Sequence, residues 1–198
     1  MLRSFIRLIY SLIPNFLKIS CFLILKKIFT LNHKLYQHLH FRGFFKQKFK
    51  DNFFYIYSLP TQIENSIFWE GVDKAYEPLT LDCWYFICKK SNEVFDIGSN
   101  TGIFILISNI SNKKANIHSF DPSKEFIIAQ KKIKEKNKID NLHINNFALG
   151  NYDGEINYDG YQVHLEDDGS FEKVKVHTLS NYLKKNNIKI NDFDSIKI

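Results

Sequence analysis

The sequence predicts an α/β fold, in which a parallel sheet wound with right-handed crossovers carries helices on its faces. Three observations predict it. From Glu93 onward short buried strands alternate with helical segments, the connections are short, and a glycine-bracketed turn follows the first strand. The chain of 198 residues, 44% of them apolar, is long enough for one such domain and an appendage.

Residues 1–50 are predicted to form a basic, hydrophobic helical arm that precedes a domain at residues 51–198. The longest uncharged run, residues 8–17, is far shorter than the roughly 20 residues that a bilayer-spanning helix needs. Pro14 and the lysines also break the apolar core of any signal peptide. Lysines that interrupt an apolar helix suit a membrane surface, and packing on the domain or on a second subunit is the alternative.

The segment between the arm and the first strand is rich in aromatic residues. Within it "ENSIFWEGVDKAYEP" is predicted to be a loop with a turn near Gly71, and Pro78 is placed to open a helix. The strand and helix alternation follows. The expected strands are residues 93–97, 115–120, 142–149 and 193–198, the expected helices are residues 79–89, 101–110, 123–138 and 178–186, and antiparallel additions are expected at residues 154–159 and 172–176.

Composition argues against nucleic acid as a partner. The net charge of +6 arises from 27 basic residues, few of which are the arginines that phosphate-reading surfaces favour. Cys21, Cys83 and Cys88 are an odd set without metal-ligand spacing, so neither a disulfide framework nor a metal site is expected. We therefore expect a cytoplasmic chain that contacts the inner face of a membrane peripherally through residues 1–50.

The glycine turn after the first strand predicts a small-molecule site. Because Gly98 and Gly102 lack a Cβ, a ligand can approach the backbone closely, and ligands of such sheets sit beyond the carboxyl ends of the strands. The turn lacks both the Gly-Lys-Ser/Thr of a triphosphate cradle and the third glycine of the dinucleotide fingerprint. Asp96, two residues before Gly98, would repel phosphate and attract an ammonium or a sulfonium.

A second carboxylate extends this prediction. Asp121 ends the next predicted strand about 20 residues after the turn, where an acidic residue accepts hydrogen bonds from a ribose diol. Ammonium, sulfonium and ribose together describe S-adenosylmethionine. The alternative for both Asp96 and Asp121 is turn or helix-cap chemistry.

Five blocks of the sequence resemble, in order and spacing, the FkbM-type methyltransferases, a branch of the Rossmann-like class I enzymes that depend on S-adenosylmethionine. The blocks are "FDIGSNTGIFILI", "IHSFDPS", "INNFALGNYDGEINY", "VKVHTLSNYLKK" and "FDSIKI". The resemblance covers residues 68–198 and implies O-methylation of a glycan or small-molecule hydroxyl. In this family the last block continues into an acidic segment, so we expect a truncated chain with an incomplete sheet and no transferase activity.

The resemblance implies three groups of cofactor contacts. Asp96 would hold the methionine ammonium, directly or through water, beside a glycine turn that lines the methionine. Asp121, where the family usually has Glu, would hold the ribose, and the segment after the third strand would contact adenine through an amide, a ring and a backbone N–H. Phe147 serves equally well as a core residue. The predicted cofactor-binding residues are Asp96, Gly98, Ser99, Asn100, Gly102, Asp121, Asn146, Phe147 and Ala148.

Two other functions stay open from the sequence. One is a non-catalytic Rossmann-like module at a membrane surface, in which the arm makes the functional contact. The other is a nucleotide-dependent dehydrogenase. Neither the methyl acceptor nor the catalytic base can be identified from the residues.

Overall fold

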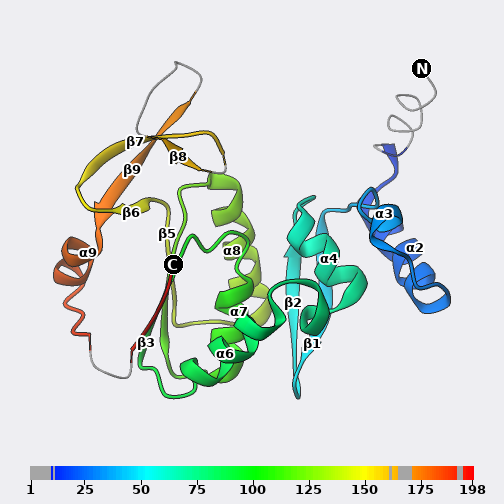
Figure 1. The fold of residues 1–198 in the computed structure, drawn as a ribbon, viewed down its shortest axis with the longest axis horizontal. Helices are drawn as coiled ribbons and strands as arrows, with labels where there is room; N and C mark the ends of the chain where they lie inside the picture. The colour runs from blue at the N-terminus through cyan, green and yellow to red at the C-terminus, as the bar shows by residue number, and fades with distance from the viewer. Residues whose placement is uncertain (1–9, 11, 161, 165–170, 191–193) are drawn as a thin grey trace. The chain divides into compact units, whose positions relative to one another are not determined.

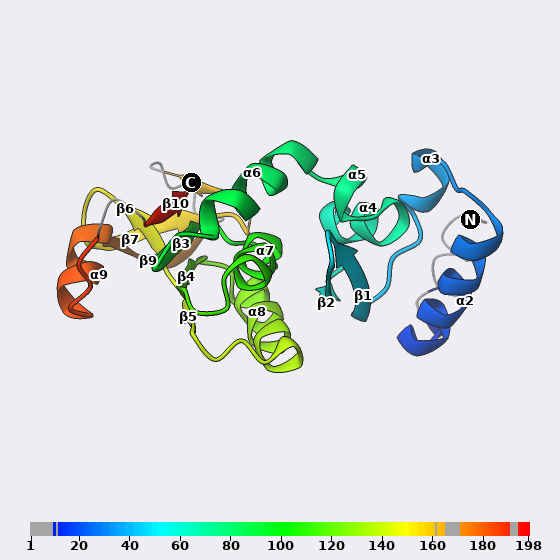
Figure 2. The same cartoon turned by 90° about the horizontal axis from the view of Figure 1, so that it is seen from below.

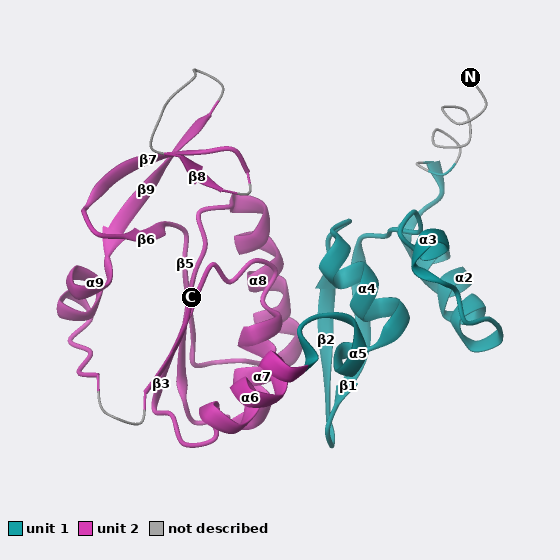
Figure 3. Ribbon diagram, viewed as in Figure 1, with its two compact units in different colours: residues 1–78 teal, residues 79–198 magenta. Residues whose placement is uncertain are grey.

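The computed structural model describes residues 10, 12–160, 162–164, 171–190 and 194–198, whose elements are labelled in Figure 1. The chain forms two compact units, Met1–Pro78 and Leu79–Ile198 (Figure 3). The boundary that the sequence predicts after residue 50 falls instead inside a β-hairpin of the first unit. This hairpin pairs β1 (Gly43–Phe49) with β2 (Asn52–Ser58) in antiparallel register.

The first unit contains the predicted helical arm, residues 1–50, but this arm is not all helical, because β1 lies within it. The helices of the unit are α2 (Asn15–Ile28), α3 (His33–Tyr36), α4 (Gln62–Glu70) and α5 (Val72–Ala75). In β1, Phe45 and Phe49 are buried whereas Lys46 and Lys48 are exposed. This alternation of buried and exposed side chains is typical of a half-buried strand, and it explains why the last part of the predicted arm is a strand and not a helix. Of the helices that the structure describes, none has the length and apolar character that a membrane crossing requires.

The predicted loop around Gly71 is also wrong, because helices lie on both sides of this glycine. Gly71 has φ 96° and ends α4, a conformation that glycine adopts without a Cβ penalty. Asn65 of α4 is buried, and its Nδ2 donates to the Tyr36 carbonyl at 2.9 Å. Phe68, on the same helix, packs edge-on against Phe45 with ring centroids 5.3 Å apart.

The second unit confirms the predicted α/β fold with a parallel sheet and flanking helices. The described strands of the sheet run in the order β10-β3-β4-β5 and are all parallel. Figure 2 shows α7 and α8 on one side of the sheet and α9 on the other. The strands are β3 (Glu93–Ile97), β4 (Asn116–Phe120), β5 (Leu142–Asn145) and β10 (Ser195–Lys197), and the helices are α6 (Pro78–Cys88), α7 (Ile103–Ser111), α8 (Lys124–Asn137) and α9 (Leu179–Lys185).

The predicted helix cap in this unit is confirmed, because the Oγ of Ser123 accepts the Phe126 N–H at the start of α8. Thr178 caps α9 in the same way through the Asn181 N–H. The core between the sheet and α9 is aromatic. Phe120 and Tyr182 lie edge to face there, with ring centroids 4.8 Å apart.

A second sheet, ordered β6-β9-β7-β8 in the described part of the chain, replaces the end of the predicted third strand. Its strands are β6 (Ala148–Gly150), β7 (Gly154–Tyr158), β8 (Val163–His164) and β9 (Glu172–Thr178). The segment 142–149 therefore forms parts of two strands in two sheets. Between them Asn146 donates from Nδ2 to the Asp121 and Pro122 carbonyls, which turns the chain away from β5. The antiparallel pairing predicted for the later segments is confirmed by β7 and β9.

Candidate ligand site

The strand order of the parallel sheet reverses between β3 and β10. The chain passes from β3 outward to β4 and β5, and β10 then pairs with the opposite edge of β3. In open parallel sheets, ligands bind beyond the carboxyl ends of the strands at such a reversal. The glycine turn at residues 98–102 follows the carboxyl end of β3, so it lies at this point.

A pocket of about 500 Å³ opens beyond the carboxyl ends of β3 and β4. This volume is within the range of about 300–1,000 Å³ that small-molecule sites have. Four of the predicted cofactor-binding residues line it, namely Gly98, Asn100, Asp121 and Ala148. The sequence analysis missed the other lining residues, which come from the ends of β3 and β4, from α8, and from the second sheet and its connections. They are Ile97, Phe120, Pro122, Phe126, Leu149, Tyr158, Gln162 and Val163.

The backbone amides of the glycine turn are already used within the chain. The Gly98 and Ser99 N–H groups both donate to the Phe120 carbonyl, at 2.9 and 3.1 Å. The N–H groups of residues 100–102 donate to the Asp121 carboxylate, the Asn100 side chain and the Ser99 carbonyl. The turn therefore offers a ligand open space rather than free backbone donors. That space lies beside Gly98, where a Cβ would meet no atom within 4 Å.

Two other residues of the turn belong to the framework and do not line the pocket. Ser99 is buried, its Oγ donates to the Asp96 carbonyl at 2.6 Å, and it accepts the Phe120 N–H at 3.0 Å. Gly102 has φ +100°, and a Cβ at this position would lie 2.6 Å from Ile133 Cδ1 on α8. Gly102 thus permits the close packing of α7 on α8.

Asp96 lies beneath the turn, is 0% exposed and does not line the pocket. Neither of its carboxylate oxygens accepts a hydrogen bond from the described residues, but Lys197 Nζ lies 3.4 Å from Oδ1. Burial raises the pKa of Asp96 to about 6, and the charge of Lys197 opposes this shift. The cation that the sequence analysis assigned to a ligand is supplied here by the chain itself.

The sequence analysis missed Lys197, because no local pattern in the sequence specifies the register of the fourth strand. The residue pairs in parallel register with Asp96, so the two side chains lie on adjacent strands. Lys197 Nζ also donates to the Ile97 and Gly98 carbonyls at 3.2 Å each and lies 4.9 Å from the centre of the Phe104 ring. A register for the fourth strand would have placed this cation beside Asp96.

Asp121 faces the pocket and also braces the turn. Its Oδ2 accepts the Asn100 N–H and its Oδ1 accepts the Ser123 N–H, both at 2.8 Å. The side chain is 5% exposed, and burial raises its pKa although these two hydrogen bonds oppose the shift. A carboxylate has about four acceptor sites, so two backbone bonds leave capacity for a ligand. Turn chemistry and ligand binding are therefore compatible at this residue.

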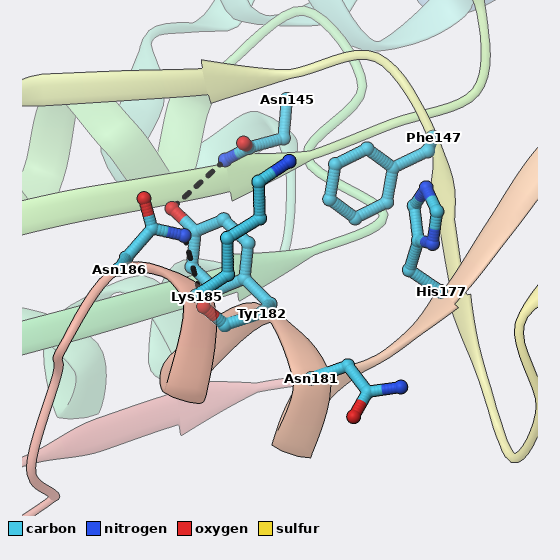
Figure 4. Close-up of a pocket in the computed structure, with 7 residues that line it drawn as sticks. All are labelled: Asn145, Phe147, His177, Asn181, Tyr182, Lys185 and Asn186. Carbon is cyan, nitrogen blue, oxygen red and sulfur yellow. Dashed lines mark hydrogen bonds between the residues drawn. The ribbon is translucent and has the colours of Figure 1, made fainter.

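The three residues predicted to contact adenine are separated by the structure. Ala148 lines the pocket described above, whereas Phe147 lines a different pocket of about 210 Å³ (Figure 4). In that second pocket the Phe147 ring is edge-on to His177, with centroids 4.7 Å apart, and it also packs on Phe120. Asn146 is exposed and uses its amide for the backbone contacts given above.

A buried histidine lies beneath the second pocket and was not predicted from the sequence. His118 Nε2 lies 2.7 Å from Glu93 Oε2, and its Nδ1 lies 2.8 Å from the Tyr182 hydroxyl. The ring stacks between Phe95 and His143, each at 4.8 Å. Burial lowers the pKa of His118, and the Glu93 carboxylate opposes this shift. These residues are far apart in the sequence, and the pairing of β3, β4 and β5 together with the packing of α9 brings them together.

Comparisons with known proteins do not assign a family. No protein-family model matches the chain, and no curated protein sequence matches it. Among solved structures, the chain is similar to a SAM dependent methyltransferase from Agrobacterium tumefaciens, with 10% sequence identity and a TM-score of 0.39. The similarity covers 54% of this chain and 33% of that chain. A likeness this distant carries no argument about function.

Proposed function

We propose that the chain is a Rossmann-like class I methyltransferase of the FkbM type, which uses S-adenosylmethionine to methylate a hydroxyl group of a glycan or small molecule. The observation that carries the proposal is the common pocket of Gly98, Asn100, Asp121 and Ala148 at the carboxyl ends of β3 and β4. The reversal of strand order at β3 and the five sequence blocks in family order support it.

The residues present fit the cofactor in three respects. Asp121 would accept hydrogen bonds from the ribose with the lone pairs that the backbone leaves unused. The apolar side chains of Phe126, Leu149 and Val163 would enclose the adenine, and the open space beside Gly98 would admit the methionine. Asp96 would contact the methionine ammonium only after Lys197 moves aside, because its carboxylate is fully buried.

The bound cofactor would supply an electrophilic methyl group on its sulfonium. The chain itself would orient the acceptor hydroxyl toward that group and exclude water, which is the main contribution a protein makes to a displacement between two bound reactants. We assign no general base.

A test of the ribose contact is the substitution Asp121→Asn. We expect it to weaken binding of S-adenosylhomocysteine about tenfold or more, because a hydrogen bond to a charged group contributes about 1.5–3 kcal/mol. Asp121→Glu, which introduces the family's usual residue, should retain most of the affinity. Isothermal titration calorimetry of the full chain measures both, and Asp140→Asn, at an exposed position outside the pocket, is the matched control.

Each result of this titration separates the candidate functions. An unchanged affinity of Asp121→Asn, with a native circular dichroism spectrum, would contradict the ribose contact. Heat with NAD but not with S-adenosylhomocysteine would favour the dehydrogenase. Heat with neither would favour the non-catalytic module, which one observation already supports: each N–H from Gly98 to Gly102 donates within the chain.

A further inference from the structure

Few side chains of helix α2 are buried against the rest of the first unit. Of its residues Asn15–Ile28, only Lys18 and Phe22 are buried. Phe22 is the anchor, since its ring packs against Trp69 and Phe41 with centroids 5.6 and 6.2 Å away. Most of the other residues of α2 are exposed to solvent.

The open side of α2 is apolar. At 100° per residue its large exposed side chains fall on one side of the helix, opposite Phe22. Phe16 is 67% exposed and Ile24 is 58% exposed, although both are large and apolar. We call this set the α2 stripe, and it consists of Phe16, Leu17, Leu23, Ile24 and Ile28.

More exposed apolar residues lie next to the α2 stripe in the sequence. Nine of the 19 large apolar side chains that are exposed among the described residues lie between Leu12 and Leu35. Single exposed apolar residues are ordinary, but a group gathered on one element marks an interaction surface. The helix can be followed in Figures 1 and 2.

Charge identifies the occupant of this surface. Residues 1–50 contain ten Lys and Arg residues and no Asp or Glu, whereas the whole chain has a net charge of +6. Residues 51–198 therefore carry a net charge of −4, the difference between +6 and +10. The positive charge of the chain is thus concentrated in the segment that carries the α2 stripe, and it would repel the same surface of a second copy.

The lysines of α2 take different sides of the helix. Lys18 Nζ lies 4.2 Å from the centre of the Tyr10 ring, and Lys26 Nζ donates to the Phe68 carbonyl, so both point to the packed side. Lys27 is exposed among the residues of the α2 stripe, and Lys34 on α3 is exposed as well. An apolar face that also carries long cationic side chains suits a membrane surface, because the alkyl stems stay buried while the ammonium groups reach the headgroups.

We propose that the α2 stripe docks on a membrane surface that carries anionic lipids. A helix of 14 residues is about 21 Å long, so it would lie in the plane of the interface, with Ile24 and its neighbours at the acyl boundary. Lys27 and Lys34 would contact the anionic headgroups, whose attraction for basic side chains falls as salt screens it.

Vesicle flotation of the full chain tests the proposal. The chain should float with phosphatidylcholine vesicles that contain phosphatidylserine, float poorly with phosphatidylcholine alone, and be released as the salt concentration rises. Ile24→Glu should reduce binding roughly tenfold or more, because it removes a large apolar side chain from the interface and adds a repelled charge. Ile128→Glu is the matched control, since Ile128 is 54% exposed on α8 and should leave binding unchanged. Lys27→Gln and its control on α8, Lys131→Gln, form a second pair, which tests the contribution of one positive charge to vesicle binding.

Several outcomes would overturn the proposal. Equal binding to neutral and anionic vesicles would remove the role of charge, and equal losses for Ile24→Glu and Ile128→Glu would remove the role of the α2 stripe. No flotation at all, together with a dimer by analytical ultracentrifugation that Ile24→Glu dissociates, would show that a second copy covers this helix. Circular dichroism of each variant verifies that the fold is retained.

Discussion

Gly102→Ala should lower the free energy of unfolding of the second unit by about 2–5 kcal/mol, the sum of two costs. A residue with a Cβ pays about 1–2 kcal/mol for the left-handed conformation, and Gly102 has φ +100°. Overpacking of a core adds about 1–3 kcal/mol, and the new methyl group would lie 2.6 Å from Ile133 Cδ1 and 3.1 Å from Ile105 Cδ1. Urea unfolding measures the loss, with Trp84 as the probe in a Trp69→Phe background.

Gly98→Ala is the matched control, because it shares the backbone strain without the collision. Gly98 has φ +69°, and no atom lies within 4 Å of the Cβ position. We expect a loss of only about 1–2 kcal/mol in stability. Its methyl group would project into the open space of the proposed cofactor pocket. Gly98→Ala should therefore lose more affinity for S-adenosylhomocysteine than Gly102→Ala does. Equal stability losses in the two variants would mean that the packing of α7 on α8 does not depend on Gly102.

The elements that the sequence predicts well depend on neighbours along the chain. The buried run before Gly98 forms β3, and the capping hydroxyl of Ser123 begins α8 within one residue of the expected position. Both signals are local, because a strand of this kind needs a short apolar run and a cap needs only the next turn of backbone. The parallel order of the sheet then follows from the alternation of strands and helices.

The features that could not be predicted depend on partners far away in the sequence. Residues 142–149 read as one strand, but the Asn146 amide binds the end of β4 and sends the chain into the second sheet. The glycine turn was predicted to bare its backbone to a ligand, yet the Gly98 and Ser99 amides donate to the Phe120 carbonyl of β4 and the Asn100 amide donates to the Asp121 carboxylate. Such pairs are fixed by strand register, which no local pattern specifies.

The same limit applies to the chemistry of Asp96. Its acidity and its place before the turn suggested a ligand ammonium, whereas the register of β10 brings Lys197 to it. The candidate site is thus predictable as a location, because glycines and carboxylates mark the ends of β3 and β4. The protein groups that already occupy its polar atoms are not predictable, since they come from β10 and from the backbone.

Asp96→Asn should stabilise the second unit near neutral pH by up to about 3 kcal/mol. The folded chain raises the pKa of Asp96 from 3.8 to about 6, because burial outweighs the attraction of Lys197. A raised pKa means that the folded state binds more protons than the unfolded state between these two values, so stability falls as pH rises through this window. A difference of about two pKa units corresponds to about 3 kcal/mol. Asparagine is neutral throughout and escapes this cost.

The decisive measurement is how the difference in unfolding free energy between Asp96→Asn and the wild type changes with pH. Well below pH 3.8 the wild-type carboxyl is protonated in both states, so Asp96→Asn should have nearly the same unfolding free energy as the wild type. The advantage of the variant should grow between about pH 4 and pH 6 and stay constant above. Urea unfolding near the two ends of this range, again with Trp84 as the probe, measures this advantage. Asp140→Asn, at an exposed position, should show no such trend.

A variant that is less stable than the wild type near neutral pH would mean that the ion pair with Lys197 outweighs the burial of the carboxylate. Asp96 would then be a structural partner of β10, and the ammonium-binding role proposed for it would be lost.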